Sequence, residues 1–368
     1  MIVKKLILVD GNAILHRAFH ALPPLTNKDG IIVNAVYGFF SMFLKILEDQ
    51  KPDFIVVCFD RKAPTFRKEL FVGYQAKRPK MSDDLVPQIK FVHEILDAAK
   101  VVMFEVDGYE ADDLIGTLAV QGVEGKIDGR RLKVEDSSLK IEDRKSIHPL
   151  PSTIKDPSST VYLPQSDIEV IIVSGDRDLL QLVNSHVKML APVTGLTNMI
   201  IYDSQKVEEK FGIKPTQIVD YKALVGDASD NYPGVAGIGP KTASALINEY
   251  GSLDGIYKNL EKIKAKNPNL ALKLAEGAEA AGLAQKLAGI VLDAPINLDI
   301  EKASMKNLDR QGMKKEFERF RFKSLLNRLS NPTSLALRGA SKRQEISNKK
   351  KGSEEQSKKL ESKQMELL

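Results

Sequence analysis

The sequence predicts a three-layer α/β domain built around a largely parallel sheet, followed by an α-helical subdomain. Three observations support this fold class. Short runs of apolar, mostly β-branched residues recur without polar alternation, which is typical of strands buried on both faces. Segments with helical periodicity lie between these runs, as parallel strand–helix–strand units require. From about residue 205 the strand pattern stops, and helices with short glycine-rich turns follow.

The elements of the first domain can be predicted in order from these patterns. Strands are expected at residues 6–9, 54–59, 101–106, 170–173 and, with a weaker pattern, 199–202. Helices are expected at residues 37–47, 87–99, 112–120 and 179–183. The α/β domain therefore spans residues 1–205, and the helical subdomain, which shows no convincing strand, spans residues 206–329.

Two further segments are too polar to belong to either core. Residues 121–167 are rich in Ser, Lys, Asp and Pro, and a loop of this length is uncommon inside a compact domain, so we predict a surface insertion. Within it, residues 132–135 and 139–142 alternate as the strands of a small hairpin would. Residues 330–368 contain no aromatic residue and many Lys, Ser and Glu, so we expect a disordered basic tail.

The composition limits the class of protein. The chain has 368 residues, 43% of them hydrophobic, which is enough for the core of one or two domains. No apolar run approaches the roughly 18–20 residues that span a bilayer, and Asp10 interrupts the apolar start before a signal peptide could form. The single cysteine, Cys58, excludes an internal disulfide and a cysteine-rich zinc site. We therefore expect a cytoplasmic protein.

The net charge is +5, and most of it belongs to the tail. Residues 331–368 hold nine Lys/Arg and five Asp/Glu, so nine minus five places +4 there. The rest of the chain is nearly neutral, unlike a protein that coats nucleic acid passively. If it binds DNA, local basic patches must do so, and acidic residues must offset them.

Acidic residues repeatedly end the predicted strands or begin the helices that follow. The carboxyl ends of parallel strands share one edge of a sheet, where ligands bind. Carboxylates gathered there would repel one another by several kcal/mol unless cations neutralised them. Such oxygen ligands suit Mg²⁺ or Mn²⁺, and two ions about 3.5–4 Å apart are the usual device for hydrolysing a phosphodiester. The nine acids are Asp10, Asp60, Glu110, Asp112, Asp113, Asp176, Asp178, Asp227 and Asp230.

Each acid taken alone also has a structural explanation. Asp10 and Asp60 can each cap the helix that follows. The acids at 110–113 can complement the positive end of a helix dipole. Asp178 can cap a helix, and Asp227 can brace a turn. The metal hypothesis therefore depends on the pattern of nine and not on any one member.

A glycine-rich segment from Gly234 to Gly239 precedes a predicted helix at residues 243–250. Its spacing superficially suggests a nucleotide-binding loop, but Pro240 stands before Lys241 and breaks that motif. A helix–hairpin–helix turn fits better, because glycines allow close approach to a DNA phosphate and the free amides of a helix N-terminus bind the anion. A plain connection between two helices is the alternative.

The order of these motifs resembles the 5′-nuclease domain at the N-terminus of bacterial DNA polymerase I and the related flap endonucleases, which have a PIN-like α/β domain. The likeness runs from Leu6 to about Leu326, interrupted by the insertion. The stretches that carry it are Leu8-Val9-Asp10-Gly11, His16-Arg17-Ala18-Phe19-His20-Ala21, Asn34-Ala35-Val36-Tyr37-Gly38-Phe39, Phe59-Asp60, Thr65-Phe66-Arg67, Glu110-Ala111-Asp112-Asp113, Gly175-Asp176-Arg177-Asp178, Gly226-Asp227-Ala228-Ser229-Asp230-Asn231 and the glycine hairpin.

The resemblance implies a structure-specific 5′–3′ exonuclease and 5′-flap endonuclease that uses two metal ions in RNA-primer removal and DNA repair. The acids matching Asp10, Asp60, Glu110, Asp112 and Asp113 would surround one ion. Those matching Asp176, Asp178, Asp227 and Asp230 would surround the second. The hairpin would hold the duplex, with a K⁺ ion as in relatives. DNA contacts are implied for Arg17, Tyr37, Arg67, Gly234, Gly237, Gly239, Lys241 and Thr242.

One position departs from the family pattern. Residues 65–85 correspond to the arch through which a free 5′ strand passes, and relatives carry a lysine directly after the tyrosine at Tyr74. This chain has Gln75 there. Arg78 matches a basic arch position, and Lys77 either takes over the role of the missing lysine or is a solvated surface residue. We expect Lys77 and Arg78 to act in catalysis.

The remaining expectations concern partners and alternatives. Residues Gln364 to Leu368 resemble the short peptide with which bacterial replication proteins bind the sliding clamp, and a DNA polymerase could act in trans. We expect a monomer associated with the nucleoid, acting on flaps, nicks and RNA–DNA primers. The alternatives are a junction-binding module without catalysis, and a PIN-like ribonuclease, which would lack the glycine hairpin and the helical subdomain.

Overall fold

The computed structural model describes residues 3–124, 168–196 and 198–330. The chain divides into two units, residues 1–313 and residues 314–368. Of the second unit, the described residues are 314–330, which comprise the end of α13 (Arg310–Arg319) and α14 (Lys323–Ser330). In that unit the ring of Phe322 contacts those of Phe317 and Phe320. The predicted tail at 330–368 lies, beyond Ser330, outside the described residues.

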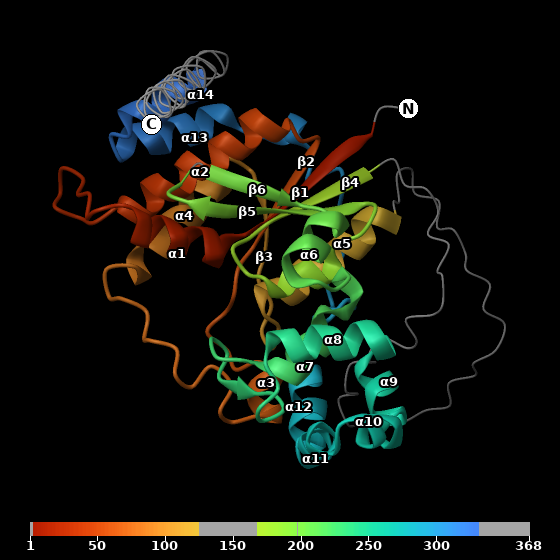
Figure 1. The fold of residues 1–368 in the computed structure, drawn as a ribbon. Helices are drawn as coiled ribbons and strands as arrows, with labels where there is room; N and C mark the ends of the chain where they lie inside the picture. Colours follow the sequence, from red (N-terminus) through yellow and green to blue (C-terminus); the bar gives the residue numbers. More distant parts are fainter. Residues whose placement is uncertain (1–2, 125–167, 197, 331–368) are drawn as a thin grey trace, which may run out of the picture. The chain divides into compact units, whose positions relative to one another are not determined.

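The first unit contains a six-stranded sheet with the order β3-β2-β1-β4-β5-β6 (Figure 1). The first five of these strands are parallel, and β6 runs antiparallel to β5. The predicted sheet with a parallel core is therefore confirmed. The strands are β1 (Lys4–Asp10), β2 (Phe54–Cys58), β3 (Val102–Phe104), β4 (Ile168–Val173), β5 (Val187–Thr194) and β6 (Asn198–Tyr202).

Strand β5 is missing from the sequence prediction for a physical reason. Its sequence includes Lys188 and Pro192, which interrupt the apolar run that marks the other strands. Proline is tolerated because the register between β5 and β6 shifts from Pro192 to Thr194, where the ladder is irregular. The Lys188 side chain reaches Glu169 of β4 at 2.6 Å.

Helices cover both faces of the sheet (Figure 1). On one face α1 packs on β1 and β2 and against α2, and α2 packs on α4. On the other face α5 packs on β1 and β4, where Leu6 and Leu8 of β1 join its core. These helices are α1 (Gly11–Ala21), α2 (Asn34–Gln50), α4 (Val86–Ala98) and α5 (Ala111–Glu124).

Two of the predicted elements differ from the structure in extent or in type. Helix α5 continues to Glu124, so its last turn occupies residues that the sequence assigned to the insertion. Its apolar face persists there, because Val123 is buried against the sheet. The rest of that insertion, with its predicted hairpin, lies outside the described residues. The helix predicted at 179–183 is a 3₁₀ helix, η1 (Asp178–Leu182).

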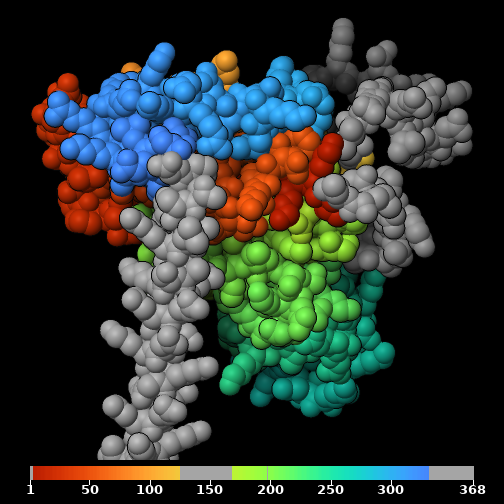
Figure 2. Space-filling model, turned by 90° about the horizontal axis from the view of Figure 1, so that it is seen from above, coloured from red at the N-terminus to blue at the C-terminus, as the bar shows by residue number. Residues whose placement is uncertain are grey.

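The region after β6 is helical, as predicted, and shares its core with the sheet. In Figure 2 the green residues that include β5 to α6 lie between the red and orange N-terminal residues and the teal helices. Its helices are α6 (Ser204–Phe211), η2 (Pro215–Gln217), α7 (Ile218–Val225), α8 (Pro240–Tyr250), α9 (Leu253–Lys258), α10 (Leu260–Lys266), α11 (Pro268–Glu276) and α12 (Ala278–Ala288).

The expectation that this region has no strand is wrong at one place. Two residues of β7 (Gly226–Asp227) pair with two of β8 (Tyr232–Pro233) in an antiparallel ribbon. The backbones approach so closely that a side chain on Gly234 would lie 2.4 Å from the Gly226 nitrogen. The ribbon is too short to leave a sequence pattern, and glycine at both positions makes it possible.

After α12 the chain returns to the α/β domain. The Gln121 side chain of α5 donates to the Ile296 carbonyl and accepts from the Leu298 amide. The Ile55 amide of β2 then donates to the Ala303 carbonyl at 2.9 Å. The helical region is thus held by the sheet domain at both of its ends. Among the described residues, no helix is long and apolar enough to span a bilayer.

Candidate active site

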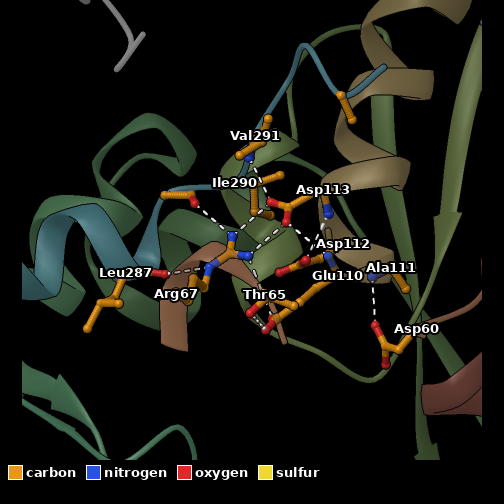
Figure 3. A network of polar contacts seen from close by, with 12 residues as sticks. Asp60, Thr65, Arg67, Glu110, Ala111, Asp112, Asp113, Leu287, Ile290 and Val291 are labelled. Atoms are coloured by element: carbon orange, nitrogen blue, oxygen red, sulfur yellow. Dashed lines mark hydrogen bonds and ion pairs between the residues drawn. The ribbon is translucent and has the colours of Figure 1, made fainter. Parts of the chain in front are cut away.

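Asp10 and Asp60 are fixed at the carboxyl edge of the sheet by hydrogen bonds. Asp10 caps α1, because its Oδ1 accepts from the Ala13 amide at 2.9 Å, and its Oδ2 accepts from the Ser174 hydroxyl at 2.7 Å. Asp60 follows β2 and accepts from the Ala111 amide at 2.7 Å (Figure 3). The structural explanation of Asp10 as a helix cap is therefore correct. The same bonds hold both carboxyl groups at one edge, where a ligand could use them.

Burial and mutual repulsion disturb the ionisation of this group. Burial, with the charges of Asp60 and Asp176, raises the pKa of Asp10 to about 7. Raised pKa values mean that the protein's own cations do not balance these carboxylates, which is the condition that a divalent cation relieves. Burial is also the largest cause that raises the pKa values of Asp60, Glu110, Asp112, Asp176 and Asp230.

Glu110 stands at the start of α5 and receives two hydroxyl groups from the arch segment. The Thr65 hydroxyl donates to its Oε1 at 3.1 Å, and the Tyr74 hydroxyl donates to its Oε2 at 3.1 Å. Both donors come from the segment that the sequence assigned to the arch. That segment contains one short helix, α3 (Phe66–Leu70), followed by turns. Glu110, with Asp10, Asp60 and Asp112, makes up what we call the first carboxylate group. Hydrogen bonds to Glu110 therefore connect this group to the arch segment.

Arg67 and Asp113 form a buried ion pair beneath this edge (Figure 3). The two guanidinium nitrogens of Arg67 donate to the two carboxylate oxygens of Asp113 at 2.8 Å each, and the side chains are 1% and 0% exposed. The same guanidinium also donates to the Leu287 and Gly289 carbonyls. The Asp113 oxygens accept in addition from the amides of Glu110 and Val291.

This arrangement corrects one prediction and bears on a second. Arg67 was expected to contact DNA, but it is buried and its donors are occupied by protein groups. Asp113 was expected to be a metal ligand, which stays a prediction; each of its oxygens accepts two hydrogen bonds from protein groups. The pair instead joins the start of α5 to the end of α12. The Asp113 carboxylate also accepts from the Glu110 amide, and its own amide donates to the Asp112 side chain.

A second group of carboxylates lies where the helical region meets the sheet. Oxygen atoms of Asp178, Asp227 and Asp230 lie within 4.8 Å of one another. Asp176 is close in sequence and accepts from the Asp178 amide at 2.9 Å. The structure therefore gathers these acids although residues 179–226 separate them along the chain. Their spacing would allow one cation to contact all three.

Lys222 of α7 reaches into this second group and is a residue that the sequence prediction missed. Its ammonium donates to Asp178 and to Asp227. Although burial opposes it, hydrogen bonds from Lys222 and Ser229 lower the pKa of Asp227 to about 2. A lone lysine in the otherwise mostly apolar α7, five residues before Asp227, was the available signal. Lys222 acts as an internal cation for part of the site.

The part of the arch segment at residues 73–78, here called the arch base, brings a cation over the carboxylates. Arg78 donates to Asp230 at 3.3 Å, and its charge also lowers the pKa values of Asp60 and Asp176 against the effect of burial. Lys77 is exposed and is part of no ion pair within the described residues. Gln75 has a left-handed backbone with φ of 55°, and its amide donates to the Asp230 carbonyl at 2.8 Å.

The glycine hairpin precedes α8 and presents free backbone groups. The amides of Gly237, Gly239 and Lys241 donate to no other residue in the part of the chain that the structure describes. Gly237 has φ of 74°, and a side chain on Gly239 would meet open space. Lys241 is exposed and Thr242 half-buried in the first turn of α8. Gly234 is different, because backbone packing against β7 explains its lack of a side chain.

One residue outside the motif flanks the hairpin. The Lys273 side chain of α11 lies over Gly237, with its Nζ 3.0 Å from the position that a Cβ there would take. Sequence reasoning could not find it, since Lys273 is one of many exposed lysines. Of the other predicted DNA contacts, Arg17 donates to the carbonyls of Val193 in β5 and of Gly195 just after β5. Tyr37 is half-buried in α2.

Comparisons with known proteins agree with this geometry. The model of the 5′-3′ exonuclease N-terminal resolvase-like domain matches residues 5–133, and that of the 5′-3′ exonuclease C-terminal SAM fold matches residues 213–311. The chain is 34% identical over 324 residues to the 5′-3′ exonuclease of Aquifex aeolicus, which covers 88% of this chain and 94% of that protein. It is 38% identical over 327 residues to DNA polymerase I of Caldicellulosiruptor bescii, covering 88% of this chain but 33% of that protein.

Solved structures share the fold. The bacteriophage T5 D15 flap endonuclease, in a pseudo-enzyme-product complex with DNA and metal ions, matches with a TM-score of 0.56 at 18% identity over 86% of this chain and 98% of that one. The catalytic core of Rad2 with DNA substrate matches with a TM-score of 0.50 at 15% identity over 89% and 93%.

The fold and the acidic edge define the class of 5′-nuclease-like proteins. The chain belongs to the 5′-3′ exonuclease family. It spans about a third of the length of the DNA polymerase I relatives that it matches.

Proposed function

We propose that this chain is a divalent-metal-dependent nuclease that hydrolyses DNA from the 5′ side, as a 5′–3′ exonuclease and 5′-flap endonuclease. The observation that carries the proposal is the convergence of carboxylates from β1, β2, β4 and the 226–231 turn on one edge. The glycine hairpin, which offers free amides to a phosphate, supports DNA as the substrate. Membership of the 5′-3′ exonuclease family is consistent with both.

The carboxylates fit hard divalent cations, because they are oxygen donors whose repulsion the protein leaves partly unbalanced. Two Mg²⁺ ions, or Mn²⁺ in their place, would activate water and stabilise charge on the phosphate. We further propose K⁺ at the hairpin. Asp10, Asp60, Glu110 and Asp112 would hold one divalent ion, and Asp176, Asp178, Asp227 and Asp230 the other.

The chain's own residues have separate tasks in this proposal. Arg78 would neutralise charge on the scissile phosphate, since it already lies over both carboxylate groups. Lys77, which is exposed, would contact the 5′ strand. The hairpin amides would fix the duplex without reading its sequence. The Arg67–Asp113 pair would hold Glu110 and Asp112 in place without touching the substrate.

The substrates would be 5′ flaps, nicks and RNA–DNA primers in replication and repair. We propose that the chain works as a monomer in the nucleoid of a bacterial cytoplasm, with a DNA polymerase acting in trans. Contact with a sliding clamp would run through Gln364 to Leu368, which lie outside the described residues. A PIN-like ribonuclease is less compatible, because the helical region and hairpin that it would lack are present.

The proposal is tested with a flap duplex that carries a fluorescent label on the 5′ strand. We expect cleavage that requires added Mg²⁺ or Mn²⁺, and about a hundredfold loss or more in Asp176→Asn and Asp178→Asn with flap binding retained. Binding is measured in Ca²⁺ by fluorescence anisotropy. Flap binding without cleavage in any divalent cation would favour the junction-binding module instead.

A further inference from the structure

Tyr232 lies behind the second carboxylate group and has no part in the proposed chemistry. It is in β8, directly opposite Asp227 of β7, and is 3% exposed. Its ring belongs to a small apolar cluster with Tyr74 and with three residues of α12. The three are Ala284, Leu287 and Ala288. The side chain therefore packs inward, while Asp227 on the paired strand carries a carboxylate of the site.

The ring of Tyr232 stacks on Tyr74 of the arch base. The ring centroids are 6.5 Å apart and the planes differ by 14°, which is within the range of favourable aromatic pairs. Tyr74 is 4% exposed, and its hydroxyl donates to Glu110 at 3.1 Å. A continuous contact thus runs from Tyr232, in the helical region, through Tyr74 to Glu110 at the start of α5.

Two hydrogen bonds to backbone carbonyls join the same two segments. The Gln75 amide donates to the Asp230 carbonyl at 2.8 Å, and the Asn231 side chain donates to the Gly73 carbonyl at 2.7 Å. Gln75 and Asn231 both have left-handed backbones, with φ of 55° and 58°. This conformation is uncommon for residues other than glycine and asparagine, so the hydrogen bond of the Gln75 amide helps to hold Gln75 in it. The arch base and the 227–232 turn therefore behave as one contact unit.

The Tyr232 hydroxyl contributes nothing to this unit. It is buried and has no hydrogen-bond partner among the described residues. The contacts of Tyr232 with this unit are therefore those of its ring.

We propose that Tyr232 is a positioning residue that sets the distance between the two carboxylate groups of the site. Asp227 lies opposite it in the ribbon, Asp230 precedes it by two residues, and Glu110 is reached through Tyr74. Two ions that act together must lie about 3.5–4 Å apart, and displacements of about 1 Å impair such sites. The inference rests on the proposed function, because it assigns Tyr232 a role in that two-ion site.

The test compares Tyr232→Leu, Tyr232→Phe and a control in the 368-residue chain. Tyr257→Leu is the matched control, because Tyr257 is a half-buried tyrosine of α9 whose hydroxyl donates to Leu274, in the same helical region but outside the Tyr74 cluster. Mn²⁺ binding is measured by calorimetry, and flap cleavage is measured under single-turnover conditions. Melting temperatures are measured for all three variants.

In Tyr232→Leu we expect the Mn²⁺ concentration for half-maximal cleavage to rise about tenfold, as when a group that orients a metal ligand is removed. The calorimetric affinity of the weaker ion should fall in parallel. Tyr232→Phe should keep wild-type affinity and rate and melt at the same or a higher temperature. Tyr257→Leu should lower the melting temperature without changing Mn²⁺ affinity.

Three results would overturn the inference. Unchanged Mn²⁺ affinity in Tyr232→Leu would mean that the ring only fills space. An equal loss of affinity in Tyr257→Leu would mean that general destabilisation is the cause. A loss of affinity in Tyr232→Phe would assign the role to the hydroxyl instead. If the wild type cleaves no DNA, the proposed function fails, and the Mn²⁺ isotherms still decide the role of Tyr232.

Discussion

Replacing Asp10 by Asn should stabilise the metal-free protein at neutral pH while it impairs metal binding. Asparagine has the same shape and caps helices as well as aspartate does, so its oxygen can still accept from the Ala13 amide. Its amide group can donate to the Ser174 hydroxyl, which now donates to Asp10. The substitution therefore removes a charge and few contacts.

The magnitude follows from the pKa of Asp10, which burial and the charges of Asp60 and Asp176 raise from 3.8 to about 7. Below pH 3.8 the carboxyl group is protonated in the folded and the unfolded chain, and it costs nothing. As the pH rises to 7, the unfolded chain ionises this group while the folded protein resists, so the folded state loses stability. The full loss is about 4 kcal/mol, as an upper bound, and it is complete once the pH exceeds 7.

Urea unfolding in EDTA at pH 4.5 and at pH 7.5 measures the effect. The free energy of unfolding of Asp10→Asn minus that of the wild type should be small at pH 4.5 and should grow to as much as about 4 kcal/mol at pH 7.5. Saturating Mg²⁺ should reverse the order, because the wild type gains more from ion binding. A difference that does not change with pH would refute the electrostatic account of this edge.

Three further predictions follow from the arch, the hairpin and the tail. Arg78→Ala should slow single-turnover flap cleavage at least about tenfold, and Lys77→Ala less; equal effects would contradict the assignment of Arg78 as the cation over the site. The association constant K for duplex DNA falls as salt rises, and Lys273→Ala should make log K against log salt less steep by about one. The slope is measured by anisotropy between 50 and 200 mM salt, and an unchanged slope would exclude a phosphate contact. A peptide ending at Leu368 should bind a cognate sliding clamp with micromolar affinity in a fluorescence titration, and Leu368→Ala should abolish binding; no binding by the unaltered peptide would refute the clamp contact.

The strand-end acids could be predicted from the sequence because their placement depends on simple geometry. Asp10 and Asp60 follow apolar runs that had to be parallel strands, and the ends of such strands meet at one edge whatever their separation along the chain. Local chemistry was sufficient there. The glycine hairpin was predictable for a similar reason, since Gly237 has the left-handed backbone that glycine favours.

The roles of Arg67 and Asp113 could not be predicted in this way. Both belong to motifs that match the family, but a motif records residue type and not burial. Whether Arg67 faces DNA or the interior depends on α12, whose Leu287 carbonyl is 220 positions away in sequence. The same long-range packing decides that Asp113 is saturated by hydrogen bonds. Such outcomes are fixed by tertiary contacts, which periodicity and spacing do not contain.

Lys222 leads to a prediction about which of the two carboxylate groups binds its divalent ion more tightly. Its ammonium neutralises Asp178 and Asp227, whereas burial and repulsion raise the pKa values of Asp10 and Asp112. An ion near Asp10 and Asp112 relieves the repulsion between their carboxylates. An ion at the second group must first displace the Lys222 ammonium. The second group should therefore bind its ion more weakly. Calorimetry with Mn²⁺ should give two events, and Lys222→Ala should tighten the weaker one, because its ligands then lose a competing cation. If Lys222→Ala weakens that event instead, Lys222 orders the ligands and does not compete with the ion.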